Sequence, residues 1–263
     1  MEASPSAKPP TAFRDYAAAA PGVRELYRLN HAHQTVDFVR GKREQYLPLR
    51  RRRMGVWRAF DALAELVDES DPDLGLSQLD HALQTAEALR AAGAERWLVL
   101  AGFVHDLGKV LCLFGEPQWA VVGDTFPVGC AHDPRIVHAD LFEANPDTRV
   151  DAYRTSLGIY QAGCGLDGLL LSWGHDEYLY HVLRPYLPPP ALAIVRYHSF
   201  YAWHREDAYA ALLAPGDEQK RAAVRRFNPF DLYSKSDARP DWPALRPFYE
   251  ALVAERLPEE LQW

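Results

Sequence analysis

The feature that most constrains the fold is an apolar run that ends abruptly in two ionisable residues. Residues 97–104 (WLVLAGFV) are apolar on every side, which is the pattern of a helix buried at the centre of a protein. A buried strand is the competing interpretation, but the Ala and Gly inside the run and its continuation through Leu107 favour a helix. His105 and Asp106 follow directly, and a buried carboxylate is costly unless it is paired, hydrogen-bonded or bound to metal. We therefore expect a polar site at the end of a central helix.

Helical spacing also dominates the rest of the chain. Val56, Phe60, Leu63 and Val67 recur every three or four residues and predict one helix with an apolar stripe. Further helices are expected over residues 77–92, 167–183 and 191–204, in a segment opened by Asn228 and Pro229, and from Pro243 onward. Residues 114–129 are rich in Gly and Pro and predict a loop or a small hairpin around residues 119–122. The predicted fold class is all-α, a mostly helical bundle with room for one small β-hairpin.

A single domain preceded by a tail is expected. Residues 1–20 are rich in Ala and Pro and predict a disordered tail, and no linker divides residues 21–263. The net charge of −7 argues against a nucleic-acid partner and against an anionic membrane surface. No stretch reaches the roughly 18 uninterrupted apolar residues of a membrane span, and the start lacks the apolar core of a signal peptide. Three cysteines without a CxxC pair fit free thiols in a reducing compartment, so the expected location is the cytoplasm.

Other histidines and an aspartate fall on separate predicted helices and could join His105 and Asp106. They are His81, His175, His198 and Asp231. In helical bundles, metal sites are built from inward-facing side chains of several helices. Four imidazoles and two carboxylates suit two ions such as iron or manganese. Zinc is also compatible, whereas calcium and magnesium are disfavoured by the nitrogen ligands.

Two residues extend this candidate site along the same segment. Lys109 follows His105 by four residues, so a continuous helix would place both side chains on one face. Gly108 adds no side-chain bulk and allows another segment to approach closely.

The order His…His-Asp…His…Asp is similar to that of the HD-domain superfamily of metal-dependent proteins, and longer strings point to one branch of it. Seven segments resemble myo-inositol oxygenase: HQTVDFV (33–39), LVDESDPD (66–73), HDLGK (105–109), GEPQWAVVGDTFPVGC (115–130), SWGHDEYLY (172–180), RYHSFYAWH (196–204) and FNPFDLYSK (227–235). The resemblance covers the chain from about Phe13 to the end, and strings of this length are far more specific than the His-Asp spacing. The resemblance implies an HD-domain-like helical bundle with a di-iron centre.

The resemblance also implies how the centre is divided. The first iron would be held by four residues, which are His81, His105, Asp106 and Asp231. The second iron would be held by His175 and His198, with Asp106 as the bridge between the two. In the family, the pair is mixed-valent Fe(II)/Fe(III).

The family's substrate pocket corresponds to Arg14, Asp68, Glu69, Ser70, Lys109, Gly123, Asp124, Ser199 and Lys235. The resemblance implies a monomer that cleaves myo-inositol with O2 to D-glucuronate and water, the first step of inositol catabolism. Asp106 and Lys109 would be the catalytic residues. A site for a polyol needs convergent polar groups, and Lys109 and Asp124 would be poor core residues but suitable partners for hydroxyls.

Two other functions stay open. An HD-type phosphohydrolase would use the same ligands to hold metals that activate water, although no clear arginine-rich phosphate pocket accompanies the motif. A non-catalytic metal-binding or interaction module would not need the long pocket strings. Oxygen uptake with inositol, phosphate release from nucleotides, or neither activity would distinguish the three.

Overall fold

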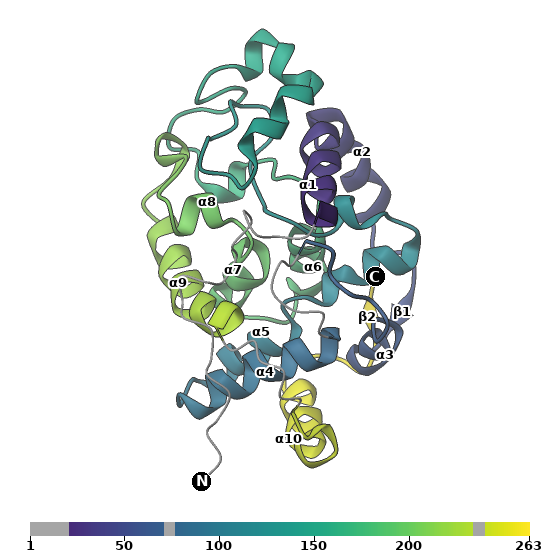
Figure 1. Ribbon diagram of the computed structural model, residues 1–263. Helices are drawn as coiled ribbons and strands as arrows, with labels where there is room; N and C mark the ends of the chain where they lie inside the picture. Colours follow the sequence, from purple (N-terminus) through teal and green to yellow (C-terminus); the bar gives the residue numbers. More distant parts are fainter. Residues whose placement is uncertain (1–20, 71–76, 234–239) are drawn as a thin grey trace.

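The computed structural model describes residues 21–70, 77–233 and 240–263, and these residues are mostly helical (Figure 1). The α-helices are α1 (Pro21–His33), α2 (Val36–Tyr46), α3 (Val56–Ala62), α4 (Gln78–Ala91), α5 (Arg96–Val104), α6 (His175–Leu183), α7 (Pro189–Tyr197), α8 (Tyr201–His204), α9 (Asp217–Tyr233) and α10 (Trp242–Ala254). The long connection between α5 and α6 consists of loops and short 3-10 helices, of which η2 (Leu107–Phe114) and η3 (Gln118–Ala120) matter for the site. The all-α prediction is confirmed.

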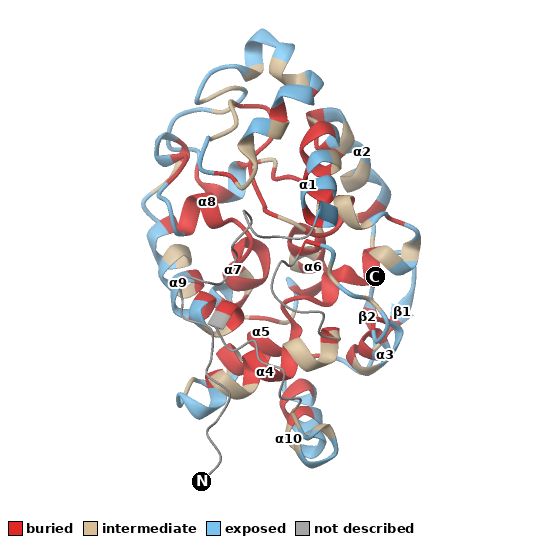
Figure 2. Cartoon of the chain, in the orientation of Figure 1, coloured by how far each residue is buried: buried red, intermediate tan, exposed pale blue. Residues whose placement is uncertain are grey.

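Helix α5 is the centre of the fold, as the apolar run predicts. Every residue from Leu98 to Val104 is buried, and α4, α7 and α9 pack against this helix. In Figure 2 the buried residues concentrate on the central helices, whereas the outer faces of α2 and α10 are exposed. The helices that surround α5 are therefore placed to direct side chains toward its C-terminal end.

One stretch, Arg96–Phe114, has the length and composition of a membrane-spanning helix. However, 78% of its most apolar window is buried inside the protein. The stretch is also not one α-helix, because α5 ends at Val104 and the 3-10 helix η2 begins at Leu107. Its apolar residues contribute to the protein core.

Two predicted helices begin or end elsewhere. Helix α3 stops at Ala62, so Val67 lies outside it and is 51% exposed. The helix predicted from residue 167 begins only at His175. The apolar residues before it are extended instead, because Ser172 N donates to Phe126 O (2.7 Å) and Leu170 O accepts from Val128 N (2.9 Å). An apolar run of this length fits both a helix and an extended segment, and here its backbone pairs with a distant loop.

Two further boundary predictions were wrong. Asn228 and Pro229 do not open a helix, since α9 runs from Asp217 through both, with Pro229 in its interior. The helix starts earlier because the buried Asp217 carboxylate accepts Leu166 N and Ala214 N at 2.9 Å each, which anchors its first turn. The segment predicted from 191 to 204 is divided into α7 and α8 by a break at residues 198–200. Proline removes one helical hydrogen bond but does not dictate where a helix begins.

The small sheet is not a hairpin. Residues 118–120 form the 3-10 helix η3, so the loop alternative holds for that segment. The two strands, β1 (Arg53–Met54) and β2 (Leu261–Gln262), are antiparallel and far apart in the sequence. Trp263 secures the pairing, because its indole Nε1 donates to Met54 O at 2.8 Å and its carbonyl accepts Arg51 N at 2.6 Å.

A buried ion network joins helices α6 and α7. The Glu177 side chain is 1% exposed and accepts Arg196 Nε at 2.7 Å, and it also contacts Arg43 and His181. Burial opposes its charge, but His181 and Arg196 outweigh burial and lower the pKa of Glu177 to about 2. The network fixes Glu177, two residues after His175, to Arg196, two residues before His198.

We expect Glu177→Gln to lower the free energy of unfolding at pH 7 by about 3–5 kcal/mol, since the Arg196 charge stays buried beside a neutral partner. The folded pKa of about 2 lies below the ordinary glutamate pKa of roughly 4.3. The contribution of Glu177 is therefore complete above about pH 4.3 and is lost as the pH falls toward 2, so the difference from wild type should shrink over that window. Urea unfolding of metal-free protein measures it. Glu95→Gln, which breaks the exposed Glu95–Arg226 pair, is the control and should change nothing measurable. Equal effects of the two substitutions would contradict the prediction.

Candidate metal centre and substrate pocket

The six predicted ligands converge at the C-terminal end of α5. His105 and Asp106 lie directly after this helix, and His175 is the first residue of α6. His81 comes from α4, His198 follows α7, and Asp231 comes from α9. His81 is half-buried and the other five side chains are buried. Residues separated by up to 150 positions are thus brought to one buried point.

The first group of donor atoms surrounds one oxygen of Asp231. His81 Nε2 lies 3.0 Å and His105 Nε2 lies 3.4 Å from Asp231 Oδ1. Asp106 Oδ2 lies 3.5 Å from His105 Nε2 and 3.7 Å from His81 Nε2. Donors that share one ion at about 2.1 Å are roughly 3.0–3.5 Å apart, so this group is close to the size of a coordination sphere.

The second group uses the other oxygen of Asp106. Asp106 Oδ1 lies 3.3 Å from His175 Nε2 and 3.5 Å from His198 Nε2. The two Nε2 atoms are 3.3 Å apart, which again fits one shared ion. Because Oδ2 faces the first group and Oδ1 faces the second, Asp106 has the position of a bridging carboxylate.

Hydrogen bonds to backbone carbonyls orient three of the imidazoles. Nδ1 of His105 lies 2.8 Å from Gly102 O, Nδ1 of His175 lies 2.7 Å from Val121 O, and Nδ1 of His198 lies 3.1 Å from Ile194 O. A carbonyl can only accept, so each Nδ1 carries a proton, and the Nε2 atom of each ring faces the centre as the potential metal donor. Lone pairs of nitrogen and carboxylate oxygen that face one another at these distances repel unless a proton or a metal cation lies between them.

The electrostatics of His175 agree with a cation at this point. Burial lowers the pKa of His175, but the Asp176 and Asp106 carboxylates outweigh burial and raise it to about 10. A group of donors that attracts a proton this strongly also attracts a metal ion, which displaces the proton when it binds. The donor set therefore fits one or more transition-metal ions.

Lys109 balances part of the negative charge. Its side chain is buried, and its Nζ lies 2.6 Å from Asp106 Oδ2 and 2.8 Å from Asp68 Oδ2. Burial lowers the pKa of Lys109, but the Asp106 and Asp68 charges outweigh burial and raise it. The same ammonium, together with His105, outweighs the burial of Asp106 and keeps its pKa well below the usual range.

The predicted reason for the placement of Lys109 was wrong. Lys109 does not share an α-helical face with His105, because α5 ends at Val104 and the 3-10 helix η2 follows. Its partner is Asp106, three residues earlier, since side chains at i and i+3 eclipse in a 3-10 helix. Because the helix changes from α to 3-10 after Val104, Lys109 pairs directly with Asp106 instead of lying on the same helix face as His105.

The predicted pocket residues in the described part of the chain lie in two segments and beside His198. In the first segment, Ser70 N and Ser70 Oγ donate to Asp68 Oδ1 at 2.8 and 2.6 Å, while the Glu69 side chain is exposed. The second segment contains Gly123, whose φ of +107° favours glycine, and the buried Asp124. Arg14 and Lys235 lie outside the described residues.

Ser199 and Asp124 are linked to the rest of the site. Thr125 N donates to Ser199 O at 2.9 Å, which joins the loop after Asp124 to the residue after His198. Tyr27 OH donates to Asp124 Oδ1 at 3.0 Å. Val121 O also accepts hydrogen bonds from His175. The loop of residues 121–125 is therefore attached both to the start of α6 and to the segment that follows α7.

A family model described as myo-inositol oxygenase matches residues 20–263. The chain belongs to the myo-inositol oxygenase family. The relatives agree with this assignment. Inositol oxygenase 1 of Arabidopsis thaliana is 50% identical over 261 residues, which cover 95% of this chain and 84% of the relative. Inositol oxygenase of Homo sapiens is 48% identical over 264 residues, which cover 98% of this chain and 93% of the relative. The resemblance that the sequence strings indicate is confirmed.

Membership of the myo-inositol oxygenase family makes the chain an oxidoreductase and implies a metal cofactor. Among the described residues, two groups could hold a metal ion, which are His81 with His105 and Asp106, and Asp106 with His175 and His198. Within each group, the donor atoms all lie within 4.8 Å of one another.

Sequence reasoning missed three residues at the centre of this family member. Asp176 Oδ1 lies 2.7 Å from His175 Nε2. Gln118 holds the turn of Asp68, because its Oε1 accepts Glu69 N at 3.0 Å and its Nε2 donates to Val67 O at 2.9 Å. Tyr27, from α1, contacts Asp124 as described above. The one available signal was that His175 and Asp176 repeat the His-Asp pair of residues 105 and 106.

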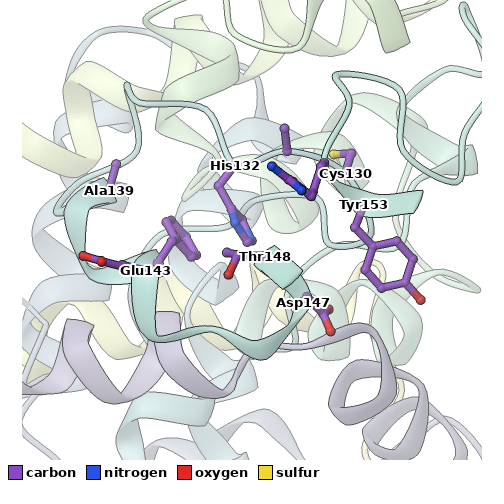
Figure 3. A pocket seen from close by; sticks show the side chains of 10 residues that line it. Cys130, His132, Ala139, Glu143, Asp147, Thr148 and Tyr153 are labelled. Carbon is purple, nitrogen blue, oxygen red and sulfur yellow. The ribbon is translucent and has the colours of Figure 1, made fainter. Parts of the chain in front are cut away.

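A separate cavity of about 290 Å³ lies away from the metal centre. Its walls come from residues 130–132 and 139–154, and Figure 3 shows His132, Asp147 and Thr148 among the side chains that line it. None of the predicted site residues is among them.

Proposed function

We propose that this chain is an inositol oxygenase that converts myo-inositol and O2 to D-glucuronate and water by cleaving one carbon–carbon bond of the ring. The reaction balances without another reductant, because the substrate loses four electrons and O2 accepts them. The observation that carries the proposal is the position of Asp106, whose two oxygens face separate groups of histidines while Lys109 lies 2.6 Å away. Family membership supports the same function.

We further propose that the cofactor is a pair of iron ions in the mixed-valent Fe(II)/Fe(III) state. The first would be held by His81, His105 and Asp231, the second by His175 and His198, and Asp106 would bridge them. Imidazole and carboxylate donors suit iron, and oxygen-only ions such as magnesium are disfavoured by the nitrogen donors. When bound, the iron pair supplies Lewis acidity toward a substrate hydroxyl and the redox capacity to use O2.

Lys109 would provide positive charge beside the reacting hydroxyl. Its Nζ is held between Asp106 and Asp68, so the charge is fixed in position before substrate binds. A nearby cation favours the deprotonated form of a hydroxyl. The role proposed for Lys109 is therefore to stabilise an alkoxide, and its two carboxylate partners position it without removing its charge.

The other pocket residues would recognise the polyol. Asp68, Ser70 and Asp124 are polar groups held by hydrogen bonds, and Glu69, Gly123 and Ser199 contribute their backbone or side-chain polar atoms. Fixed donors and acceptors discriminate strongly against molecules that lack matching hydroxyls. The substrate roles of Arg14 and Lys235 stay predictions.

We propose that the enzyme works as a cytoplasmic monomer without a nucleic-acid or membrane partner. The net charge of −7 supports the absence of an anionic partner, and the three free cysteines fit a reducing compartment. A single domain over residues 21–263 remains part of the same proposal, whereas the tail predicted over residues 1–20 lies outside the described residues.

Iron-loaded protein incubated with myo-inositol and O2 should form D-glucuronate and consume one O2 for each glucuronate. Glucuronate is measured by chromatography and O2 uptake by an electrode. Zinc-loaded protein is the control and should be inactive, because zinc does not change oxidation state. Absence of both glucuronate and O2 uptake would contradict the proposal, and phosphate release from a panel of nucleotides without O2 uptake would favour the phosphohydrolase instead.

A further inference from the structure

Asp176 is a third carboxylate at the histidine pair of the second group. It is the second residue of α6, and it is 1% exposed. Its Oδ1 lies 2.7 Å from His175 Nε2 and 3.4 Å from His198 Nε2. Neither the ligand set nor the pocket described above assigns it a role.

The two oxygens of Asp176 have different surroundings. Oδ2 accepts Ser199 N and Thr125 Oγ1, each at 3.2 Å. Oδ1 lies 2.7 Å from His175 Nε2, within hydrogen-bond distance. Ser199 Oγ is 3.4 Å from Oδ1, which is long for a hydrogen bond. With an ion bound at the histidine pair, both Nε2 atoms would give their lone pairs to that ion, and Oδ1 would lose His175 as a hydrogen-bond donor. A buried carboxylate oxygen normally has a donor, so in the metal-loaded protein a ligand of the ion would be needed to supply one to Oδ1.

Asp176 would lie beside an ion held by His175 and His198 rather than bind it. Two ligands of one ion at about 2.1 Å are at least roughly 3.0 Å apart, whereas Asp176 Oδ1 is 2.7 Å from His175 Nε2. Asp106 satisfies this spacing with the same histidines, at 3.3 and 3.5 Å. Asp106 therefore completes the donor group, and Asp176 borders it on the side of Ser199.

We propose that Asp176 Oδ1 accepts a hydrogen bond from the polyol hydroxyl that binds the ion held by His175 and His198. This inference rests on the proposed function and adds to it one residue that touches substrate. A carboxylate accepts but does not donate, so at this position it favours a hydroxyl over an ether or a ketone. Its Oδ2 bonds to Thr125 and Ser199 fix the direction in which Oδ1 points.

Asp176→Asn tests the acceptor directly. Ser199 N must still be accepted, so the amide oxygen takes the position of Oδ2 and the NH2 group faces the ion and its ligand. We expect the iron content to equal that of wild type and the Kd for myo-inositol to rise about ten- to hundredfold, the usual range for a hydrogen bond to a charged group. Iron is measured by mass spectrometry, and inositol binding by anaerobic titration of the electron paramagnetic resonance signal.

Two further variants separate this role from a structural one. Asp217→Asn is the matched control, because Asp217 is also a buried carboxylate that accepts two backbone N–H groups, Leu166 N and Ala214 N. It should leave iron content and inositol affinity unchanged. Thr125→Val keeps the carboxylate but removes one anchor of Oδ2, so it should weaken inositol binding less than Asp176→Asn does, and it serves if Asp176→Asn does not fold.

The outcomes distinguish the possibilities. Loss of iron from Asp176→Asn would make Asp176 a metal ligand and overturn the inference. Inositol affinity equal to wild type in Asp176→Asn, or in Thr125→Val if only that variant folds, would also overturn it. If wild-type protein with full iron content bound no inositol, the proposed function itself would fail, and this inference with it.

Discussion

Asp106→Asn is expected to remove both metal ions together. Asp106 is the residue whose two oxygens reach both groups, with Oδ2 facing His81 and His105 and Oδ1 facing His175 and His198. A neutral amide is a weaker ligand than a carboxylate and cannot offer two equivalent oxygens. Turnover should fall by more than the ~10–100-fold that follows loss of a residue supporting a ligand, since here a ligand shared by both ions is lost.

The measurement is iron per protein chain, together with glucuronate formation. Asp231→Asn is the matched comparison, because Asp231 contacts only the first group, through His81 and His105. It should lose the first ion and keep part of the second. If Asp106→Asn kept one ion in the manner of Asp231→Asn, Asp106 would not be the bridge. Lys109 stays paired with Asp68 at 2.8 Å in the Asp106 variant, so loss of the fold is not the expected cause of inactivity.

Gly108→Ala is expected to disrupt the centre through its backbone. A Cβ atom at residue 108 would lie 2.1 Å from His175 O and 2.8 Å from His175 C. Neither is the tip of a flexible side chain, so η2 and the start of α6 must separate. Overpacking of this kind costs about 1–3 kcal/mol or more, and here it also moves the ring of His175 away from Asp106 and His198. We expect lower stability and lower iron content in the same variant.

Gly41→Ala is the matched control. Gly41 lies inside α2, and a Cβ there meets no atom within 4 Å. Alanine in a helix interior is more favourable than glycine by roughly 0.5–1 kcal/mol, so this variant should unfold at slightly higher urea and bind normal amounts of iron. Similar unfolding and iron content for the two variants would show that the close approach at Gly108 is not required.

The sequence was sufficient for what depends on residue type and spacing. The run before His105, which is apolar on every side, predicts a buried central helix. The C-terminal end of that helix is then the position at which histidines from the other helices can converge. The structure brings the six predicted ligands together there, while their binding of metal stays a prediction for the experiments above. The family could be recognised from strings of residues because most of these strings contain a candidate metal ligand or pocket residue together with the residues that flank it.

What the sequence could not provide depends on backbone contacts between distant segments. Nothing in residues 105–109 signals that the helix changes from α to 3-10, so the Asp106–Lys109 pair could not be found from helical phase. The extended conformation of residues 169–171 depends on hydrogen bonds to residues 126–128. Asp176 was overlooked because its place in the site depends on the 2.7 Å distance between its Oδ1 and His175 Nε2, which the sequence does not reveal.

The carbonyl of Val121 accepts two hydrogen bonds from His175, one from its backbone N at 2.8 Å and one from its ring Nδ1 at 2.7 Å. Val121 opens the loop that carries Gly123 and Asp124. Libraries that randomise this loop to obtain activity on other cyclitols must therefore keep the backbone of Val121 in place, because a shift of its carbonyl would also reorient His175. The turn of Asp68 and Ser70 makes no such contact with a histidine among the described residues; its constraint is Lys109, whose Nζ lies 2.8 Å from Asp68 Oδ2, so substitutions there would act on the ammonium rather than on the metal ligands.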